Sequence, residues 1–200
     1  MSALQPSSHV RRLNPEDAPA AIGVLCAGFW EDSFLRWAAP DELARTILGH
    51  RWATAAVGMA AEHVEGLIAD DASGAALWAA PGTEFWTADG RAEFFDALTT
   101  ALGDRVGELT RLAPISDAHP DEPHWYLHKI AVHPSRQGLG LGPRLVEPML
   151  ERADADGVPV YLESSNPRNR SFYHRLGFEP GLSIELQSGE DLLTMVRPAR

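Results

Sequence analysis

The sequence predicts a mixed α/β fold, because segments with the period of a strand alternate with segments that carry helix signals. Trp125 to Val132 is an apolar and aromatic run typical of a strand, and a glycine-rich turn follows it. Leu141, Leu145 and Met149 then recur at helical spacing, which indicates a helix with one apolar face. Strands before, between and after helices therefore indicate one mixed sheet flanked by helices.

A single domain accommodates this sheet, because 200 residues with 44% hydrophobic side chains are enough for one core. We expect residues 1–9 to form a flexible N-terminal tail and residues 10–200 to form the domain. The tail has no apolar segment of the signal-peptide kind, and no run approaches ~18 uninterrupted apolar residues. Cys26 is the only cysteine, which excludes an intrachain disulfide and a two-cysteine metal site. We therefore expect a cytoplasmic protein without a metal.

The N-terminal half alternates strand and helix signals. A strand opens at Val10 to Leu13, and Asn14 and Pro15 supply an N-cap and a first-turn proline for a helix that runs to about Ala27. Three further segments follow in this order: a helix over Asp41 to Trp52, a hairpin that joins Gly66–Ala69 to Ala75–Ala80, and a helix in one or two pieces over Phe85 to Leu112.

The C-terminal half begins with a polar loop, Pro114 to Pro123, which leads into the strand Trp125 to Val132. After the glycine turn and its helix, a second strand carries Glu163. A further helix then ends near Phe178. A final hairpin joins Ile184–Leu186 to Leu192–Val196.

The glycine turn between the first of these strands and its helix reads Gln137-Gly138-Leu139-Gly140-Leu141-Gly142. Glycine permits the positive φ angles that turn several N–H groups toward one point, and it lets a ligand approach the backbone. The N-terminus of the following helix adds unsatisfied donors and a partial positive charge. The turn is therefore a candidate site for a pyrophosphate.

A dinucleotide-binding turn is the main alternative. Strand, Gly138-x-Gly140-x-Gly142, helix, strand and then Glu163 come close to that fingerprint, in which an acidic residue binds a ribose hydroxyl. The spacing argues against it, because the fingerprint requires a small residue where this chain has Pro143. If the fingerprint is instead aligned to start at Gly140, its small residue would have to be Leu145, which is too large. The turn also lacks the Lys-Ser/Thr ending of a nucleoside-triphosphate loop.

Three motifs follow one another in this region: Gln137-x-x-Gly140-x-Gly142, then Asn169 with Tyr173, then Leu176-Gly177-Phe178. In content and order they resemble the pyrophosphate loop, the coenzyme A helix and the following turn of the GCN5-related N-acetyltransferase (GNAT) superfamily. The chain looks most like the puromycin N-acetyltransferase branch in these segments: Glu122-Pro123-x-Trp125, Gln137-Gly138-x-Gly140-Leu141-Gly142, Leu162-Glu163-x-Ser165 and Pro167-Arg168-Asn169-x-x-Phe172-Tyr173. The N-terminal half matches only loosely, so puromycin itself is not implied.

The resemblance implies a mixed, mostly antiparallel sheet that splays between its fourth and fifth strands, with acetyl-coenzyme A in the split. Ile130 and Val132 would offer backbone groups to the pantetheine arm, as a strand edge does to an added strand. Asn169 would bond the same arm, although it could instead be a helix-start residue that satisfies local donors. The expected cofactor-binding residues are Ile130, Val132, Gln137, Gly138, Leu139, Gly140, Leu141, Gly142, Asn169 and Tyr173.

The implied reaction is direct attack of an amine on the thioester of acetyl-coenzyme A in a ternary complex, which requires an acid and a base. The family match places Tyr173 beside the sulfur, where its neutral phenol could protonate the leaving thiolate. Two candidates for the base remain open. If the strand is regular, His128 shares the cleft-facing side with Tyr126, Ile130 and Val132, whereas a bulge would change that. Glu163 on the neighbouring strand could be the base, could hold the substrate ammonium, or could only pair with an arginine.

Other side chains have both a functional and a structural interpretation. An aromatic group in the N-terminal half could select the acceptor or could be core: Phe29, Trp30, Phe34, Trp37, Trp78, Phe85 and Trp86. Arg136 and Arg170 could reach the coenzyme A phosphates or could be solvated. Glu31 and Asp32 are expected to be a solvated pair.

The formal net charge of −11 disfavours nucleic acid and anionic membranes as partners and fits a cationic or neutral amine. We therefore predict an N-acetyltransferase that acts on a small primary amine, with antibiotics and other natural products among the candidates, as a monomer or a homodimer. Two alternatives stay open: acetylation of protein or peptide N-termini, and a non-catalytic sensor of acyl-coenzyme A.

Overall fold

The computed structural model describes residues 9–62, 64–187 and 190–200. The expected N-terminal tail, residues 1–9, lies outside the described residues except for His9. The helices of these ranges are η1 (Pro15–Asp17), α1 (Ala18–Gly28), α2 (Ser33–Ala38), α3 (Glu42–Glu62), α4 (Ala88–Leu102), η2 (Gly103–Leu112), α5 (Ala113–Asp117), η3 (Pro134–Arg136), α6 (Leu141–Asp156) and α7 (Pro167–Arg175), where η marks a 3₁₀-helix.

The described strands form one sheet in the order β1-β2-β3-β4-β5-β7-β6. Their bounds are β1 (Val10–Arg12), β2 (Glu65–Ala69), β3 (Gly74–Ala79), β4 (Trp125–Val132), β5 (Val160–Ser164), β6 (Glu179–Gln187) and β7 (Glu190–Arg197). Neighbouring strands are antiparallel except β4 and β5, which are parallel. The predicted mixed, mostly antiparallel sheet is confirmed.

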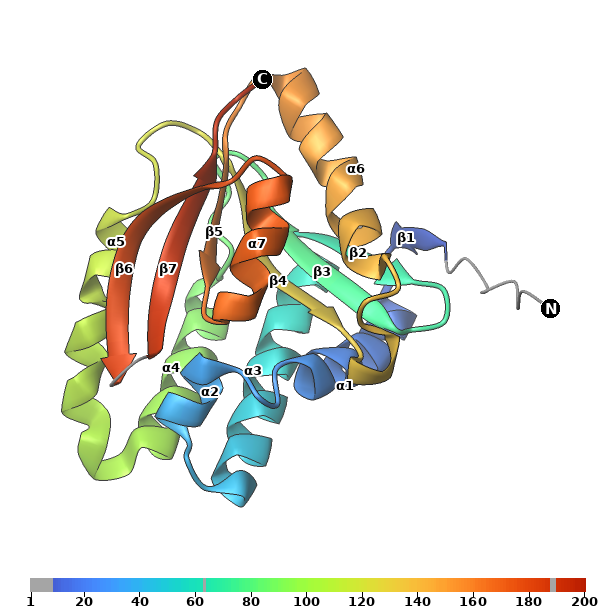
Figure 1. Ribbon diagram of the computed structural model, residues 1–200. Helices are drawn as coiled ribbons and strands as arrows, with labels where there is room; N and C mark the ends of the chain where they lie inside the picture. The colour runs from blue at the N-terminus through green and yellow to red at the C-terminus, as the bar shows by residue number, and fades with distance from the viewer. Residues whose placement is uncertain (1–8, 63, 188–189) are drawn as a thin grey trace.

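Helices cover both faces of this sheet (Figure 1). α1 and α3 pack on one face, where Leu25 and Trp52 join the buried side chains of β3. α6 packs on the other face through Leu141, Leu145 and Met149, the stripe that the sequence predicts, and α7 joins the same cluster. A third buried cluster connects α2, α3 and α4 to β6 and β7. The core is therefore continuous from one edge of the sheet to the other.

The sheet opens between β4 and β5. These strands pair over only three positions, from Trp125 opposite Val160 to Leu127 opposite Leu162. Beyond this point β4 continues along β3 as far as Val132, while β5 continues along β7 as far as Ser164. The expected splay is confirmed, and it leaves one edge of β4 without a strand partner.

A β-bulge interrupts β4 at the start of this opening. Leu77 of β3 pairs with Lys129, but the next residue, Trp78, pairs with Leu127. His128 is therefore the extra residue, and a bulge of this kind changes which face the following side chains point to.

The alternation expected for a regular β4 does not hold through the bulge. Tyr126 packs with the cluster beneath α1 and α3, whereas Ile130 and Val132 pack against the cluster beneath α6. His128 nevertheless stays with Tyr126 and lines the same cavity. The bulge thus keeps Tyr126 and His128 on one face and turns the Ile130 and Val132 side chains to the face that α6 covers.

Several predicted boundaries are wrong. The helix expected over Asp41 to Trp52 continues to Glu62, and the helix expected to begin at Phe85 begins at Ala88. Its second piece is 3₁₀, and α5 occupies part of the predicted loop at Pro114 to Pro123. Thr87 explains the later start of α4, because its hydroxyl accepts the Gly90 N–H as an N-cap. Within the described residues, none of the helices combines the length and apolarity needed to cross a bilayer.

Candidate active site

The glycine turn keeps the conformation that its sequence predicts at two positions. Gly138 and Gly140 have φ angles of +75° and +78°, and a Cβ at either position would meet nothing within 4 Å. Positive φ, not crowding, is therefore what requires glycine there. Gly142 differs because it lies inside α6, where a Cβ would make an ordinary 3.6 Å contact with Phe172 of α7. Gln137 closes the turn, since its side-chain amide donates to the Val132 carbonyl at 3.1 Å.

α7 begins at the other side of the split. Asn166 is its N-cap and accepts the Arg168 N–H at 3.0 Å, so the alternative role of Asn169 as the helix-start residue is not supported. Asn169 is exposed and Tyr173 follows one turn later, and both line one cavity. Burial raises the pKa of the Tyr173 phenol, which therefore stays protonated at neutral pH.

That cavity has a volume of about 1070 Å³ and extends from α7 to the segment between α5 and β4. It brings together five of the predicted site residues: His128, Ile130, Glu163, Asn169 and Tyr173. Val132 and the glycine turn are not part of its described lining. The predicted site residues therefore separate into a cavity group and a turn group at the start of α6.

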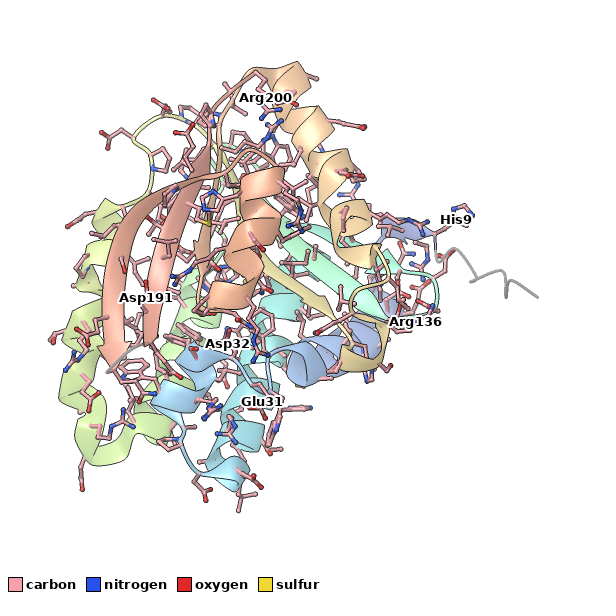
Figure 2. The ribbon with its side chains drawn as sticks, in the orientation of Figure 1. His9, Glu31, Asp32, Arg136, Asp191 and Arg200 are labelled. Atoms are coloured by element: carbon pink, nitrogen blue, oxygen red, sulfur yellow. The ribbon has the colours of Figure 1, made fainter. Side chains whose placement is uncertain are left out.

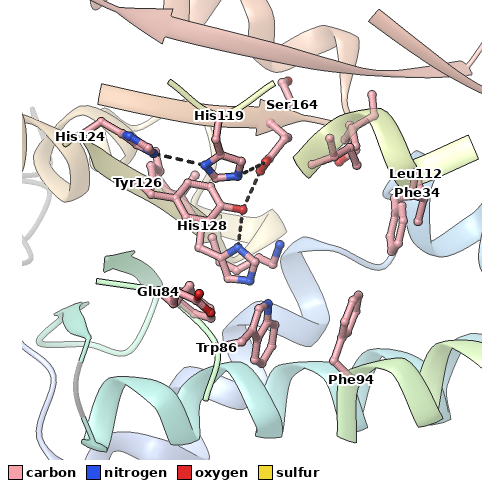
Figure 3. Close-up of a pocket in the computed structure, with 18 of the residues that line it drawn as sticks. Phe34, Glu84, Trp86, Phe94, Leu112, His119, His124, Tyr126, His128 and Ser164 are labelled. Atoms are coloured by element: carbon pink, nitrogen blue, oxygen red, sulfur yellow. Dashed lines mark hydrogen bonds and ion pairs between the residues drawn. The ribbon is translucent and has the colours of Figure 1, made fainter. Parts of the chain in front are cut away.

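One wall of the cavity is aromatic (Figure 3). Trp86 stacks on Phe94 with ring centroids 5.4 Å apart, and Phe85 packs on the His128 ring at 3.7 Å. Phe34 lines the cavity as well, whereas its predicted neighbour Trp37 is buried in the core. The aromatic residues singled out in the sequence thus divide into a cavity wall and core, except Trp30, which is in neither and whose ring centroid lies 4.7 Å from the Arg45 guanidinium.

The opposite wall carries a row of hydrogen-bonded polar side chains (Figure 3). The Tyr126 hydroxyl lies 2.7 Å from Glu163 Oε2 and 2.7 Å from His128 Nδ1. His128 Nε2 is a buried atom that has no hydrogen-bond partner in the part of the chain that the structure describes. Burial, together with Lys129 and His119, lowers the pKa of His128 well below its ordinary value, so the ring is neutral at pH 7.

Glu163 is held in the ionised state. Burial opposes its ionisation, but His119, Tyr126 and Lys129 together lower the pKa of this carboxyl below its ordinary value. His119 Nε2 lies 3.5 Å from the Oε1 atom of Glu163. Among the described residues, Glu163 therefore contacts a tyrosine and a histidine. It does not pair with an arginine there, which was one of the roles that the sequence left open.

Sequence reasoning missed His119 and His124, which lie beside Tyr126 in the segment after α5. The two rings are joined at 3.2 Å between His119 Nδ1 and His124 Nε2, and His124 Nδ1 lies 2.9 Å from the Glu122 carbonyl. The segment has no periodic pattern, so its only signal was the presence of two histidines close together in a polar loop.

Lys129 was also missed as a site residue, although it is the only lysine of the sequence. Its ammonium lies 5.0 Å from the centroid of the Trp52 ring and shares the cavity with Asp32 and Glu163. Burial lowers the pKa of Lys129 to about 8, an effect that the two carboxylates oppose.

Asp32 corrects a prediction, because it is not part of a solvated pair with Glu31 (Figure 2). Its side chain is 6% exposed, caps α2 by accepting the Phe34 N–H at 3.0 Å, and accepts the Ser165 hydroxyl. Glu31 is exposed and pairs with Arg36 at the surface. Asp32 therefore joins α2 to the loop that enters α7.

Both arginines expected near the coenzyme A phosphates have carboxylate partners. Arg136 pairs with Asp71 at 3.0 Å, and Arg170 pairs with Asp191 at 2.6 Å. A phosphate contact would require either side chain to exchange or share that partner.

The arrangement of split sheet, glycine turn and Tyr173 helix can be compared with known proteins. Residues 72–178 match the model of the acetyltransferase (GNAT) family. The chain belongs to this family. Membership places it among acyltransferases, and GNAT enzymes use acetyl-coenzyme A. The matched range runs from the β2–β3 turn to Phe178, just after α7, and it therefore contains the turn group and the whole cavity group.

Two curated relatives show how far the similarity extends. An uncharacterized N-acetyltransferase of Schizosaccharomyces pombe is 30% identical over 142 residues, which are 62% of this chain and 55% of that protein. An L-methionine sulfoximine/L-methionine sulfone acetyltransferase of Pseudomonas aeruginosa is 35% identical over 81 residues, which are 38% of this chain and 47% of that protein. The chain spans about half the length of the curated relatives that it matches.

Solved structures share the fold over nearly the whole chain. A Corynebacterium glutamicum crystal structure described as histone acetyltransferase HPA2 and related acetyltransferase is 26% identical, with a TM-score of 0.66 and coverage of 97% of both chains. An N-acetyltransferase of Thermoplasma acidophilum in complex with coenzyme A is 14% identical, with a TM-score of 0.57 and coverage of 96% of this chain and 99% of that chain. The second likeness concerns the fold alone.

Proposed function

We propose that residues 10–200 form a single-domain, acetyl-coenzyme A-dependent N-acetyltransferase that acts on a primary amine of a small molecule. One observation carries the proposal: a single cavity joins Tyr173 and Asn169, at the split of the sheet, to an aromatic wall and a neutral histidine. Donor, acceptor and proton-transfer groups then have room in one cavity, as direct transfer between two bound substrates requires.

The residues at the split fit acetyl-coenzyme A. The N–H groups of Gly138 to Leu141, with the N-terminus of α6, are suited to its pyrophosphate. Ile130 and Val132 lie where β4 has lost its partner β5, so their backbone can pair with the pantetheine amides. Asn169 projects from α7 into the same space. When bound, the donor supplies an acetyl thioester.

The reaction assigns a role to two side chains. The nitrogen of a neutral amine forms a bond to the acetyl carbon, the carbon–sulfur bond breaks, and the products are an amide and coenzyme A. Tyr173 donates its phenolic proton to the leaving sulfur. His128 receives the proton that the amine loses, because its ring is neutral and its Nε2 lies at the cavity without a hydrogen-bond partner among the described residues. Glu163 is instead assigned to orient Tyr126, whose hydroxyl donates to Oε2 at 2.7 Å. Its Oε1 atom lies 3.5 Å from His119 Nε2 and has no hydrogen-bond partner among the described residues.

The acceptor is a small amine with an apolar or aromatic group. Trp86, Phe94 and Phe34 line the far part of the cavity, and such rings stack on flat apolar groups. A peptide N-terminus would need an open groove, so a short peptide is included among the test substrates below. The resemblance to the puromycin N-acetyltransferase branch supports an aromatic amine, while the Pseudomonas relative acts on an amino acid derivative.

Release of the coenzyme A thiol in the presence of acetyl-coenzyme A tests this function. We would compare puromycin, simple arylalkylamines, L-methionine sulfoximine and a short peptide with a free N-terminus. The expected result is amine-dependent release that is fastest with an aromatic amine. Release with the peptide alone would support N-terminal acetylation instead. Acetyl-coenzyme A binding without release for any acceptor would support the sensor.

A pair of variants connects the acceptor to the aromatic wall. Trp86→Ala removes a ring from the cavity and should raise KM for aromatic amines more than for aliphatic ones. Leu43→Ala is the matched control, because Leu43 lies on α3 with 70% of its surface exposed and does not line the cavity.

A further inference from the structure

The row of polar side chains along the cavity has a direction, which follows from what each group can donate. Tyr126 is the centre of the row, with Glu163 Oε2 and His128 Nδ1 both 2.7 Å from its hydroxyl oxygen. A tyrosine hydroxyl has a single proton, and it can donate that proton to only one of these neighbours. The other neighbour must then donate to the tyrosine oxygen.

The ionisation of Glu163 decides the direction. A carboxylate can only accept, so Tyr126 donates to Glu163 when that side chain is ionised. The Tyr126 oxygen then accepts a hydrogen bond from the N–H at His128 Nδ1. Because a neutral imidazole carries one proton, His128 Nε2 keeps its lone pair and can act as a base.

Protonation of Glu163 reverses both hydrogen bonds. The carboxylic acid then donates to the Tyr126 oxygen, and Tyr126 donates to His128 Nδ1. The single proton of the neutral His128 ring must move to Nε2, where it blocks the lone pair. One proton on Glu163 therefore changes the tautomer of a histidine that Glu163 does not touch.

The two remaining histidines determine which state of Glu163 is favoured. A backbone carbonyl only accepts, so His124 Nδ1 donates to the Glu122 carbonyl at 2.9 Å. His119 Nδ1 and His124 Nε2 are 3.2 Å apart, so one proton lies between them. His119 Nε2 lies 3.5 Å from Glu163 Oε1, and His119 favours the carboxylate.

His119 and Lys129 are the neighbours that favour the Glu163 carboxylate. Burial lowers the pKa of His124, so its ring is neutral at pH 7. The His119 ring packs against Tyr161, whose centroid is 4.1 Å away. Lys129 is a cation in the same cavity, and together with His119 it lowers the pKa of Glu163.

We infer that the ionised Glu163, acting through Tyr126, sets the tautomer that makes His128 a base, and that His119, oriented by His124, holds Glu163 in this state. The inference rests on the proposed function, because it assigns His128 as the base of acetyl transfer. Glu163, Tyr126, His119 and His124 are positioning residues in this arrangement.

Long-range nitrogen–proton NMR of the histidine rings tests the arrangement without any substrate. In the wild-type protein at neutral pH, His128 should carry its proton on Nδ1. In Glu163→Gln the amide oxygen should face the His119 donor, so the amide nitrogen faces Tyr126 and donates to it. His128 should then carry its proton on Nε2. A wild-type proton on Nε2, or the same tautomer in both proteins, would overturn the inference.

Kinetics test the role of His119. His119→Gln removes the imidazole that helps to lower the pKa of Glu163, so the acid limb of the kcat/KM profile should move to higher pH. The NMR-detected change of the His128 tautomer should move with it. His50→Gln is the matched control, because His50 is exposed on α3. In Tyr126→Phe, protonation of Glu163 should no longer move the His128 proton from Nδ1 to Nε2. A His119→Gln profile identical to the wild type would contradict the assignment of His119.

The two proposals fail in different ways. If the wild-type protein transfers acetyl groups to no amine but His128 shows the expected tautomers, the proposed function is wrong. The control of the His128 tautomer by Glu163 is then still supported. If acetyl transfer occurs but His128 does not show the expected tautomers, the control of the tautomer by Glu163 is wrong and the proposed function is still supported.

Discussion

Tyr173 illustrates how one residue combines burial with chemistry. Its ring packs in the cluster beneath α6, 5% exposed, and yet it lines the cavity. Burial raises the pKa of the phenol, which keeps the proton available for a leaving thiolate. The same environment makes the anion costly, so the proton must be regained from solvent or from the amine after each turnover.

Tyr173→Phe should retain the packing and lose the proton. We expect kcat to fall by about a hundredfold or more, the usual range for the loss of a general acid, with little change in acetyl-coenzyme A affinity. Steady-state kinetics and calorimetric titration of the same variant provide the measurement. An unchanged kcat under conditions where chemistry limits the rate would remove Tyr173 from the mechanism.

Lys129 gives a prediction about stability and pH. Its pKa is about 8 in the folded protein against 10.5 for an ordinary lysine, so folding below pH 8 carries the cost of a buried charge. Between these two values the unfolded chain binds more protons, and stability therefore rises with pH in this window. Lys129→Met removes the charge and should raise the free energy of unfolding at pH 7 by on the order of 2 kcal/mol.

The pH dependence separates this effect from a change in packing. The difference between Lys129→Met and wild type, measured by urea unfolding, should shrink between pH 7 and pH 10 as the wild-type lysine loses its proton. A difference that is the same at both pH values would show that burial of the charge is not its cause.

Among the elements, the glycine turn and α6 show what sequence reasoning can reach. Spacing alone indicated the positive φ positions and the buried stripe of α6, because both depend on local geometry. The bulge at His128 was not predictable in the same way, since it depends on how β3 and β4 pair. Only the paired register shows that Tyr126 and Ile130 face opposite sides.

Two glycines of the turn provide a matched pair of substitutions. Gly140→Ala places a side chain at a φ of +78° and should cost about 1–2 kcal/mol of stability and weaken acetyl-coenzyme A binding. Gly142→Ala lies in the helix with only an ordinary contact and should be neutral or stabilising. Thermal unfolding and calorimetry check both. Equal losses for the two variants would contradict the assigned role of positive φ.

The segment between α5 and β4 shows what sequence reasoning could not reach. His119 and His124 belong to no repeating pattern, and their importance arises from contacts with Tyr126, Tyr161 and Glu163 across the sheet. Asp32 was misjudged for the same reason, because its partner Ser165 is distant in the sequence. Local patterns identify elements, while the polar contacts between elements need the folded chain.

For the molecule as a whole, the sheet has two halves that pair directly at only three positions of β4 and β5. The half from β1 to β4 carries the glycine turn and α6, and the half from β5 to β6 carries α7. The halves part beyond the paired positions (Figure 1). The residues that line the cavity come from both halves. A ligand in the split would therefore contact both halves of the sheet.

Calorimetric titration of the wild-type protein with acetyl-coenzyme A tests the central claim most directly, with a dinucleotide such as NAD as the comparison ligand. The account predicts one-site binding of acetyl-coenzyme A in the micromolar range and no heat with the dinucleotide. Binding of the dinucleotide without binding of acetyl-coenzyme A would contradict the account.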